Sequence, residues 1–266
     1  MDKLRKLQQI LTQMHSVLIA YSAGVDSTFL LKVAAMTLPR DRLLAVTANS
    51  PTYPKLELLK ARRMTKKMDV RHKIIKTQEL KDRRFVSNPA NRCYFCKKEL
   101  FSKLKSLARE FHLRYVVDAS SSSDRLDFRP GERAKKEFCI RSPLAEACLN
   151  KEEIRCLSKT LGLPTWNQPA QTCLASRIPY GERILPIVLA RVDKAESYLR
   201  RLGFRQVRLR HYNGLCRIEV GRDEIQGLFS KRETIVKKFK KLGYYYVTLD
   251  LEGYRTGSMN EILRRP

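Results

Sequence analysis

The sequence predicts an α/β fold, with a parallel sheet covered by helices on both faces and a smaller C-terminal α/β domain. Short apolar runs alternate with helical stretches through the first 165 residues, which is typical of a parallel sheet. After Pro164 the chain becomes irregular and then follows an αββαβ order. A length of 266 residues fits one large domain or two modest ones. We therefore expect a larger α/β domain at 1–165 and a smaller second domain at 166–266.

Each expected element follows from the pattern of its apolar residues. Apolar residues at helical spacing predict a helix, and a short continuous apolar run predicts a buried strand. Asn213-Gly214 favours a tight hairpin in the second domain. Segments 77–91 and 166–184 are expected to be irregular. The expected strands are 17–21, 43–47, 72–76, 115–117, 206–211, 215–220 and 245–251. The expected helices are 2–15, 28–36, 55–68, 96–111, 151–161, 186–202 and 229–242.

The charge balance is strongly basic, because 54 Lys and Arg residues face 27 Asp and Glu residues, a net charge of +27. Such a balance attracts polyanions. The basic residues are spread along the whole chain, which fits a solvated basic surface equally well. A hydrophobic content of 43% argues against a disordered chain. No run of about 18 apolar residues and no secretory segment occurs, so we expect a cytoplasmic protein without a membrane partner.

The segment 21–28, Tyr-Ser-Ala-Gly-Val-Asp-Ser-Thr, lies between an expected strand and an expected helix. A loop of small residues at this place presents backbone N–H groups and the positive end of the helix dipole to an anion. It is not a Walker loop, because it lacks Gly-Lys-Ser/Thr. A plain strand–helix turn with Asp26 or Ser27 as the N-cap also fits these residues.

Seven cysteines in a chain expected to be cytosolic argue against a disulfide framework. Cys93 and Cys96 form a Cys-x-x-Cys, whose spacing suits a metal or a cluster, or a buried pair at a helix start. Cys173 lies in an irregular, polar segment, where function is often found. The other cysteines have apolar neighbours and are expected in the core: Cys139, Cys148, Cys156 and Cys216.

Arg208 and Arg210 alternate on an expected strand, so their side chains should share one face, about 7 Å apart. Such a pair suits a phosphate or a carboxylate, while a solvated basic strand fits as well. Glu196 and Asp223 are acidic candidates for metal binding or positioning without an assigned role. Trp166, the only tryptophan, is expected to serve in packing.

The loop 22–27 closely resembles the pyrophosphate loop, Ser-Gly-Gly-x-Asp-Ser, of the N-type ATP pyrophosphatases. Taken together, several segments resemble, in order and spacing, the LarE family of ATP-dependent sulfur transferases over about residues 5–255. In that family the enzyme adenylates a pyridinium carboxylate mononucleotide and inserts sulfur, which gives the thiocarboxylate precursor of the nickel-pincer cofactor. The segments are 88–96, 128–134, 141–147, 161–166 and 173–181.

The resemblance implies that ATP, with Mg²⁺ between its phosphates, binds the loop Ser22, Ala23, Gly24, Val25, Asp26 and Ser27, with Asp26 and Ser27 in catalysis. It also implies that the substrate, a small-molecule nucleotide, is held by Ser176, Arg177, Arg208 and Arg210. Family members commonly assemble as oligomers, so a homo-oligomer is expected.

Two sulfur strategies occur in the family. One sacrifices the sulfur of a cysteine at the position of Cys173, and the other uses three cysteines to hold a [4Fe-4S] cluster with a transferable sulfur. Because this chain has Cys93 and Cys96 as well as Cys173, it resembles the cluster type.

The chain departs from the family pattern at Ala23 and Ala119, where the family has glycine. If position 23 needs a positive φ, alanine costs about 1 kcal/mol there. One alternative is a tRNA thiolase of the same superfamily, which the +27 charge favours and the LarE-like motifs of the second domain oppose. Another is a nucleotide- or RNA-binding protein that has lost turnover, suggested by Ala23 and Ala119. Nucleic acid is the less favoured partner.

Overall fold

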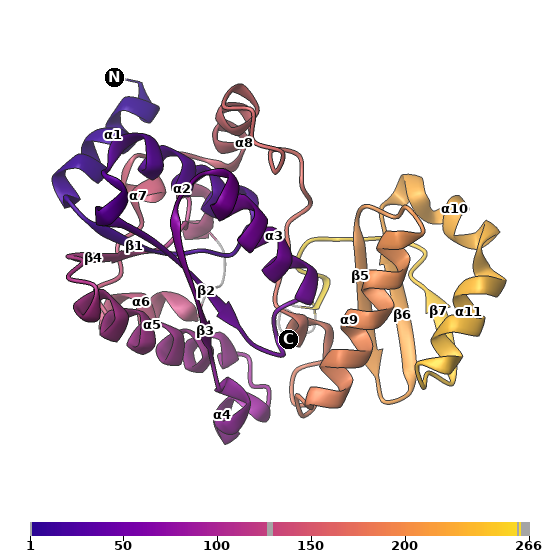
Figure 1. Ribbon diagram of the computed structural model, residues 1–266. Coiled ribbons are helices and arrows are strands. Elements are labelled where there is room, and N and C mark those ends of the chain that lie inside the picture. Colours follow the sequence, from indigo (N-terminus) through magenta and orange to yellow (C-terminus); the bar gives the residue numbers. More distant parts are fainter. Residues whose placement is uncertain (1, 127–129, 260, 262–266) are drawn as a thin grey trace. The chain divides into compact units, whose positions relative to one another are not determined.

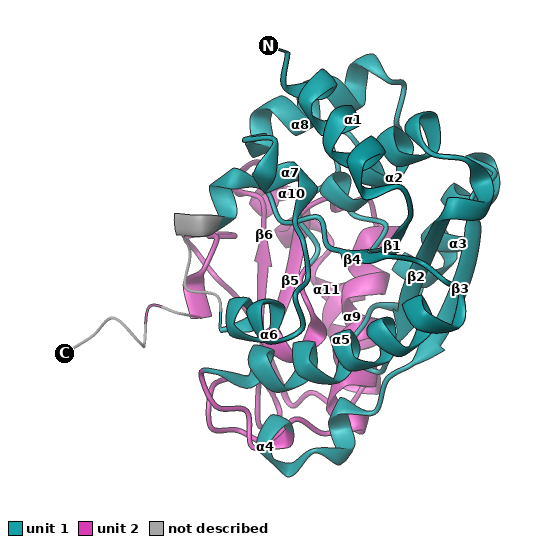
Figure 2. Ribbon diagram, turned by 90° about the vertical axis from the view of Figure 1, so that its left-hand side faces the viewer, with its two compact units in different colours: residues 1–85, 91–171 teal, residues 86–90, 172–266 magenta. Residues whose placement is uncertain are grey.

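The computed structural model describes residues 2–126, 130–259 and 261 (Figure 1). The chain divides into two compact units (Figure 2): unit 1 comprises 1–85 and 91–171, and unit 2 comprises 86–90 and 172–266. Unit 1 has a four-stranded parallel sheet flanked by helices, and unit 2 has a smaller mixed sheet. The predicted α/β fold class is therefore confirmed.

The sheet of unit 1 has the strand order β3-β2-β1-β4, and every neighbouring pair is parallel. β1 is an uninterrupted apolar run, as expected for a strand covered on both faces. The strands are β1 (Val17–Ala20), β2 (Leu43–Asn49), β3 (Arg71–Lys76) and β4 (Tyr115–Val117).

Longer helices surround this sheet, and short helical turns connect several of its elements. No helix within the described ranges is long and apolar enough to cross a membrane. The helices that precede residue 172 are α1 (Lys3–Met14), α2 (Val25–Thr37), α3 (Lys55–Lys67), α4 (Arg83–Val86), α5 (Arg92–Glu110), α6 (Gly131–Glu137), α7 (Pro143–Glu146) and α8 (Lys151–Thr160).

Alternation along the strands divides the core of unit 1 between the two faces of the sheet. Val17, Ile19 and Ala45 pack with apolar side chains of α1 and α2 on one face. Leu18 and Leu44 pack with side chains of α5 on the other face. Figure 1 shows these helices on opposite sides of the sheet, so the expectation of helices on both faces is confirmed.

Unit 2 is built on a hairpin with a third strand added in parallel. Asn213 and Gly214 have φ angles of 33° and 97°, the left-handed conformation that a tight hairpin turn requires. The basic helix expected over 229–242 is in fact two helices, because the chain leaves the helical conformation at Lys231. The elements are α9 (Pro186–Arg201), β5 (Val207–Tyr212), β6 (Leu215–Val220), α10 (Ile225–Ser230), α11 (Arg232–Lys241) and β7 (Tyr246–Leu249).

The expectation that four cysteines lie in the core is wrong for three of them. Cys139 and Cys148 are exposed, because each follows the end of a short helix with a positive φ and so lies in a surface turn. Cys156 is exposed on α8, two residues away from the buried Ile154 and therefore on another side of the helix. Cys216 is buried, and burial raises the pKa of its thiol to about 12.

Candidate functional site

The predicted phosphate loop lies at the carboxyl end of β1, an inner strand of the unit 1 sheet, and leads directly into α2. In open α/β sheets, ligands bind beyond the carboxyl ends of the strands. The N-cap of α2 is Gly24, which makes no side-chain capping bond. The expectation that Asp26 or Ser27 caps this helix is therefore wrong, while binding of phosphate by the loop stays a prediction.

The loop has an open backbone that suits an anion. Ala23 is buried and has a φ of 56°, so this position does adopt the left-handed conformation. The Ser27 hydroxyl accepts from the Ser22 N–H at 3.3 Å and lies 3.1 Å from the Ser22 hydroxyl. Within the described residues, the N–H groups of Ala23, Gly24 and Val25 meet no acceptor. Such unpaired N–H groups at a helix N-terminus form an anion-binding concavity.

Hydroxyl groups form hydrogen bonds with the residues at the start of the loop. The Tyr21 hydroxyl lies 3.2 Å from the Thr28 hydroxyl, and burial raises the pKa of Tyr21 to about 12. The Thr47 hydroxyl donates to the Tyr21 carbonyl at 2.9 Å, and the Tyr53 hydroxyl donates to the Ser22 carbonyl. Burial also lowers the pKa of His72, whose Nε2 is 2.9 Å from the Thr47 hydroxyl. Sequence analysis missed Tyr53 and His72, since neither belongs to a motif.

The second departure from the family pattern has a different consequence. Ala119 follows Asp118 and is not among the described residues with a positive φ, so alanine causes no left-handed strain there. Asp118 is buried and accepts from the hydroxyls of Ser120 at 2.8 Å and Ser142 at 2.6 Å. Its carboxylate is also 3.5 Å from Lys135 Nζ. Side-chain hydrogen bonds therefore fix the chain after β4.

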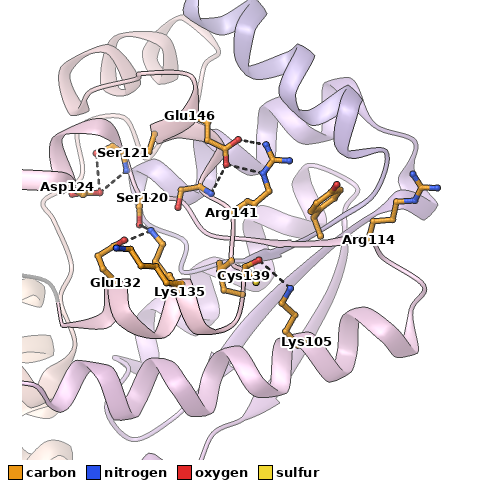
Figure 3. Close-up of a pocket in the computed structure, with 15 residues that line it drawn as sticks. Lys105, Arg114, Ser120, Ser121, Asp124, Glu132, Lys135, Cys139, Arg141 and Glu146 are labelled. Carbon is orange, nitrogen blue, oxygen red and sulfur yellow. Dashed lines mark hydrogen bonds and ion pairs between the residues drawn. The ribbon is translucent and has the colours of Figure 1, made fainter.

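A cavity of about 750 Å³ lies beside this segment (Figure 3). Arg141 is paired with Glu146, and Lys135 Nζ is 3.0 Å from a Glu132 carboxylate oxygen. Lys105 donates to the Cys139 carbonyl at 3.4 Å. Lys105, Arg114 and Lys136 also line the cavity and form no ion pair among the described residues, so the cavity has an excess of positive charge. Of the nearby motif 128–134, residues 128 and 129 lie outside the described residues.

In unit 2, Cys173 is exposed at the start of a short 3₁₀ turn, Leu174–Arg177. Arg177 is fully buried and donates from one nitrogen to the carbonyls of Thr172 and Cys173, each at 3.1 Å. The Ser176 hydroxyl donates to the Cys173 carbonyl at 2.7 Å. Arg210 donates to the Ser176 carbonyl at 2.9 Å. The structure therefore brings Cys173, Ser176, Arg177 and Arg210 together.

Glu196 lies at the centre of the buried charges in unit 2. It is fully buried and accepts from Arg177 at 2.8 Å, from Arg200 at 2.7 Å and from the Leu209 N–H at 3.0 Å. Burial alone would raise the pKa of Glu196, but Arg177, Arg200 and Arg208 lower it to about 2. Glu196 is therefore a positioning residue for Arg177, whereas Asp223 is exposed on a short turn, 222–224.

Arg208 and Arg210 lie on the same face of the hairpin, as predicted, opposite Glu219 and Arg217. The alternative of a solvated basic strand is wrong, because the two arginines are only 2% and 5% exposed. Arg210 forms an ion pair with Glu219 at 2.8 Å. Burial, and then the nearby Arg177, lower the pKa of Arg208 to about 10.

Cys93 and Cys96 lie on the first turn of α5, which begins at Arg92 rather than at Cys96 as expected. At this spacing the two thiols lie on one side of the helix. Cys93 is exposed and Cys96 is half-buried, so the alternative of a buried pair is wrong. Both belong to unit 1 and Cys173 belongs to unit 2. Each unit by itself thus presents only part of the predicted three-cysteine set, which stays a prediction.

A short segment before these cysteines, 86–90, belongs to unit 2. Asn88 donates from its side chain to the carbonyls of Ile178 and Pro179, at 3.3 and 2.6 Å. Its own carbonyl accepts from the Gly181 N–H at 3.0 Å. Asn88 is completely buried and has a φ of 57°. It therefore fixes the chain that follows the Cys173 turn, a role that sequence analysis missed.

Comparison with known proteins places the whole chain among similar sequences, although no family model matches it. An uncharacterized protein of Synechocystis sp. is 44% identical over 266 residues, 99% of each chain. The pyridinium-3,5-bisthiocarboxylic acid mononucleotide synthase of Lactiplantibacillus plantarum is 36% identical over 255 residues, 96% of this chain and 92% of the synthase. An uncharacterized protein of Methanocaldococcus jannaschii is 32% identical over 241 residues, 90% of this chain and 91% of the relative.

Substitution of Ala23 tests the left-handed conformation of the loop. In Ala23→Gly, relief of strain should contribute about 1–2 kcal/mol, while the lost buried methyl and the freer unfolded chain together cost about 1–2 kcal/mol. We expect the free energy of unfolding to change by less than about 1 kcal/mol. Ala23→Val should lose more than about 2 kcal/mol, because a branched side chain suits neither the positive φ nor the buried position. Urea unfolding measures the free energy of unfolding of both variants. Equal stabilities of Ala23→Gly and Ala23→Val would contradict the left-handed conformation at position 23.

Substitution of Glu196 tests the buried charge cluster. Glu196→Gln leaves buried guanidinium groups without their carboxylate, so the free energy of unfolding should fall by about 3–5 kcal/mol. Because the pKa of Glu196 drops from 4.5 to about 2 on folding, its contribution is present above 4.5 and lost as the pH falls toward 2. Denaturant unfolding at several pH values should therefore show a weaker pH dependence in the variant over this range. Glu233→Gln, at a carboxylate 88% exposed, is the control and should change neither quantity.

Proposed function

Because the chain belongs to the LarE family of sulfur transferases, we propose that it converts a pyridinium carboxylate mononucleotide into a thiocarboxylate used in nickel-pincer cofactor synthesis. The synthase of Lactiplantibacillus plantarum is named for such a product, a bisthiocarboxylic acid mononucleotide. The observation that carries the proposal is the Cys173 turn. The Cys173 thiol is exposed, while the buried Arg177 and Arg210 donate hydrogen bonds to backbone carbonyls of the turn.

Activation of the carboxylate is the first step of the proposed reaction. A carboxylate oxygen is a poor leaving group, so we propose that the carboxylate attacks the α-phosphorus of ATP and that pyrophosphate leaves. The open N–H groups of Ala23, Gly24 and Val25 at the N-terminus of α2 suit the ATP phosphates. Asp26, in the first turn of the same helix, is suited to interact with Mg²⁺ bound between those phosphates.

The anionic group of the substrate is proposed to bind at Arg208. Three guanidinium groups, those of Arg177, Arg200 and Arg208, act on the single carboxylate of Glu196. Among the described residues this cluster therefore has more guanidinium groups than carboxylates, which suits a substrate phosphate or carboxylate. Arg210 is engaged with Glu219 and with the Ser176 carbonyl, so in this proposal it acts by positioning Ser176 and the Cys173 turn.

We propose that sulfur is transferred at Cys173 to the carbonyl carbon of the acyl adenylate, and that AMP leaves as the carbon–sulfur bond forms. Cys93 and Cys96, accessible on one side of α5, fit as two further ligands of a [4Fe-4S] cluster. Such a cluster, if held by these three cysteines, would supply a transferable sulfide. Arg177 and Ser176 keep the Cys173 backbone in place, and the Arg177 guanidinium also interacts electrostatically with Cys173.

Substitutions in the loop test ATP binding. We expect Asp26→Ala and Ser27→Ala to abolish pyrophosphate release from ATP while circular dichroism shows a folded protein. Asp26 would lose its contact with the metal, and Ser27 would lose the hydrogen bonds that shape the loop. Ser106→Ala removes an exposed helical hydroxyl and should leave pyrophosphate release unchanged. Full activity in both loop variants would refute the site.

Substitutions of cysteines test the source of sulfur. After anaerobic reconstitution we expect bound iron and a visible absorption band, both lost in Cys93→Ala, Cys96→Ala and Cys173→Ala. Cys148→Ala and Cys156→Ala remove exposed thiols outside the set and should retain both signals. If Cys93→Ala and Cys96→Ala keep sulfur transfer while Cys173→Ala is inactive, the cluster proposal fails. Mass spectrometry would then find dehydroalanine at position 173, formed by loss of H₂S, whereas oxidation to an oxyacid adds mass.

A further inference from the structure

Side chains link two helices of unit 2, α9 and α11, to each other. Lys238 of α11 lies over the ring of Tyr198 of α9, with Nζ 5.9 Å from the ring centre. Arg191 of α9 donates at 3.2 Å to the carbonyl of Gly243, just after α11. The outward sides of the two helices therefore form one surface.

This surface has an excess of positive charge. The acids of α9, Asp193 and Glu196, are only 9% and 0% exposed, so they do not contribute to it. The one acid of α11, Glu233, lies in the first turn, 3.5 Å from Arg232. We call the surface the α9–α11 basic face, and its cations are Arg191, Lys194, Arg201, Lys237, Lys238, Lys240 and Lys241.

None of these seven cations forms an ion pair with a carboxylate in the described part of the chain. Unit 2 does pair other arginines elsewhere, such as Arg177 with Glu196 and Arg210 with Glu219. Because like charges on adjacent helices repel one another, this face favours a polyanion that approaches from solvent.

An exposed aromatic ring lies four residues after the end of α11. Tyr245 is 78% exposed, and its backbone N–H donates to the Gly214 carbonyl at 2.8 Å. Its ring lies against the hairpin turn, since a Cβ added to Gly214 would be 3.0 Å from the ring. The turn thus fixes one side of the ring, and the rest stays open to solvent. A fixed, exposed ring four residues after the last lysine of α11 suits the stacking of a nucleic-acid base.

We propose that the α9–α11 basic face binds single-stranded nucleic acid, with phosphates on its lysines and arginines and a base on Tyr245. The bases of a single strand are accessible for stacking, whereas those of a duplex are stacked on one another. An exposed row of cations on two helices matches an extended chain of phosphates better than one small anion. The inference is independent of the sulfur chemistry.

The probe is a fluorescein-labelled oligouridine of about 20 nucleotides, whose binding is followed by fluorescence anisotropy between about 50 and 200 mM salt. We expect the logarithm of the binding constant to fall linearly with the logarithm of salt concentration, by about 0.7 per phosphate contact. The double variant Lys240→Ala, Lys241→Ala should lower this slope by up to about 1.4. Tyr245→Ala should weaken binding roughly 5- to 150-fold, and Tyr245→Phe, which keeps the ring, should restore it.

The double variant Lys66→Ala, Lys67→Ala is the matched control. Lys66 and Lys67 end α3 in unit 1, as Lys240 and Lys241 end α11 in unit 2. The two double variants therefore remove the same number of positive charges. We expect this control to bind the oligonucleotide as the unchanged protein does, and circular dichroism checks that every variant is folded. Absence of binding at about 50 mM salt, or equal losses in the two double variants, would overturn the proposal. So would equally tight binding of duplex RNA or of phosphatidylserine vesicles without any effect of Tyr245→Ala.

Discussion

The buried ion pair between Arg177 and Glu196 organises unit 2. Both side chains are fully buried, so breaking the pair would leave a charge without a partner in a medium that solvates it poorly. Glu196 also accepts from the Leu209 N–H, and Arg177 also donates to the Cys173 carbonyl. One carboxylate on α9 thereby fixes both β5 and the turn that presents the exposed thiol. The position of Cys173 thus depends on a residue that is 23 positions away in the sequence.

Unit 1 shapes its loop by a different means, through backbone conformation and neutral hydrogen bonds. The loop has a positive φ at Ala23, and a hydrogen bond between the hydroxyls of Ser22 and Ser27 links its two ends. It leaves N–H groups open at the start of α2, where an anion is favoured. The two candidate sites therefore differ in design, since one offers open N–H groups and the other offers an excess of guanidinium groups.

The net charge of +27 has two distinct components in the structure. Some arginines are buried and paired, as Arg210 is with Glu219, and these stabilise the fold or position the Cys173 turn. Others lie in rows on helices and form no ion pair in the part of the chain that the structure describes, as on the α9–α11 basic face. Only the second group is available to a macromolecular polyanion, so the overall charge of the chain is a poor guide to where such a partner would bind.

The sequence by itself determined the fold class, most of the strands and helices, and the place of the loop 22–27 between a strand and a helix, because these depend on local periodicity and on small residues between the two elements. It also determined that Arg208 and Arg210 share a face, since alternation along a strand is a local property. Only the tertiary structure decided that these arginines are buried, and that Cys139, Cys148 and Cys156 are exposed. Burial depends on contacts between distant residues, such as Arg210 with Ser176 and Asn88 with Ile178, and no local pattern of residues encodes those pairs.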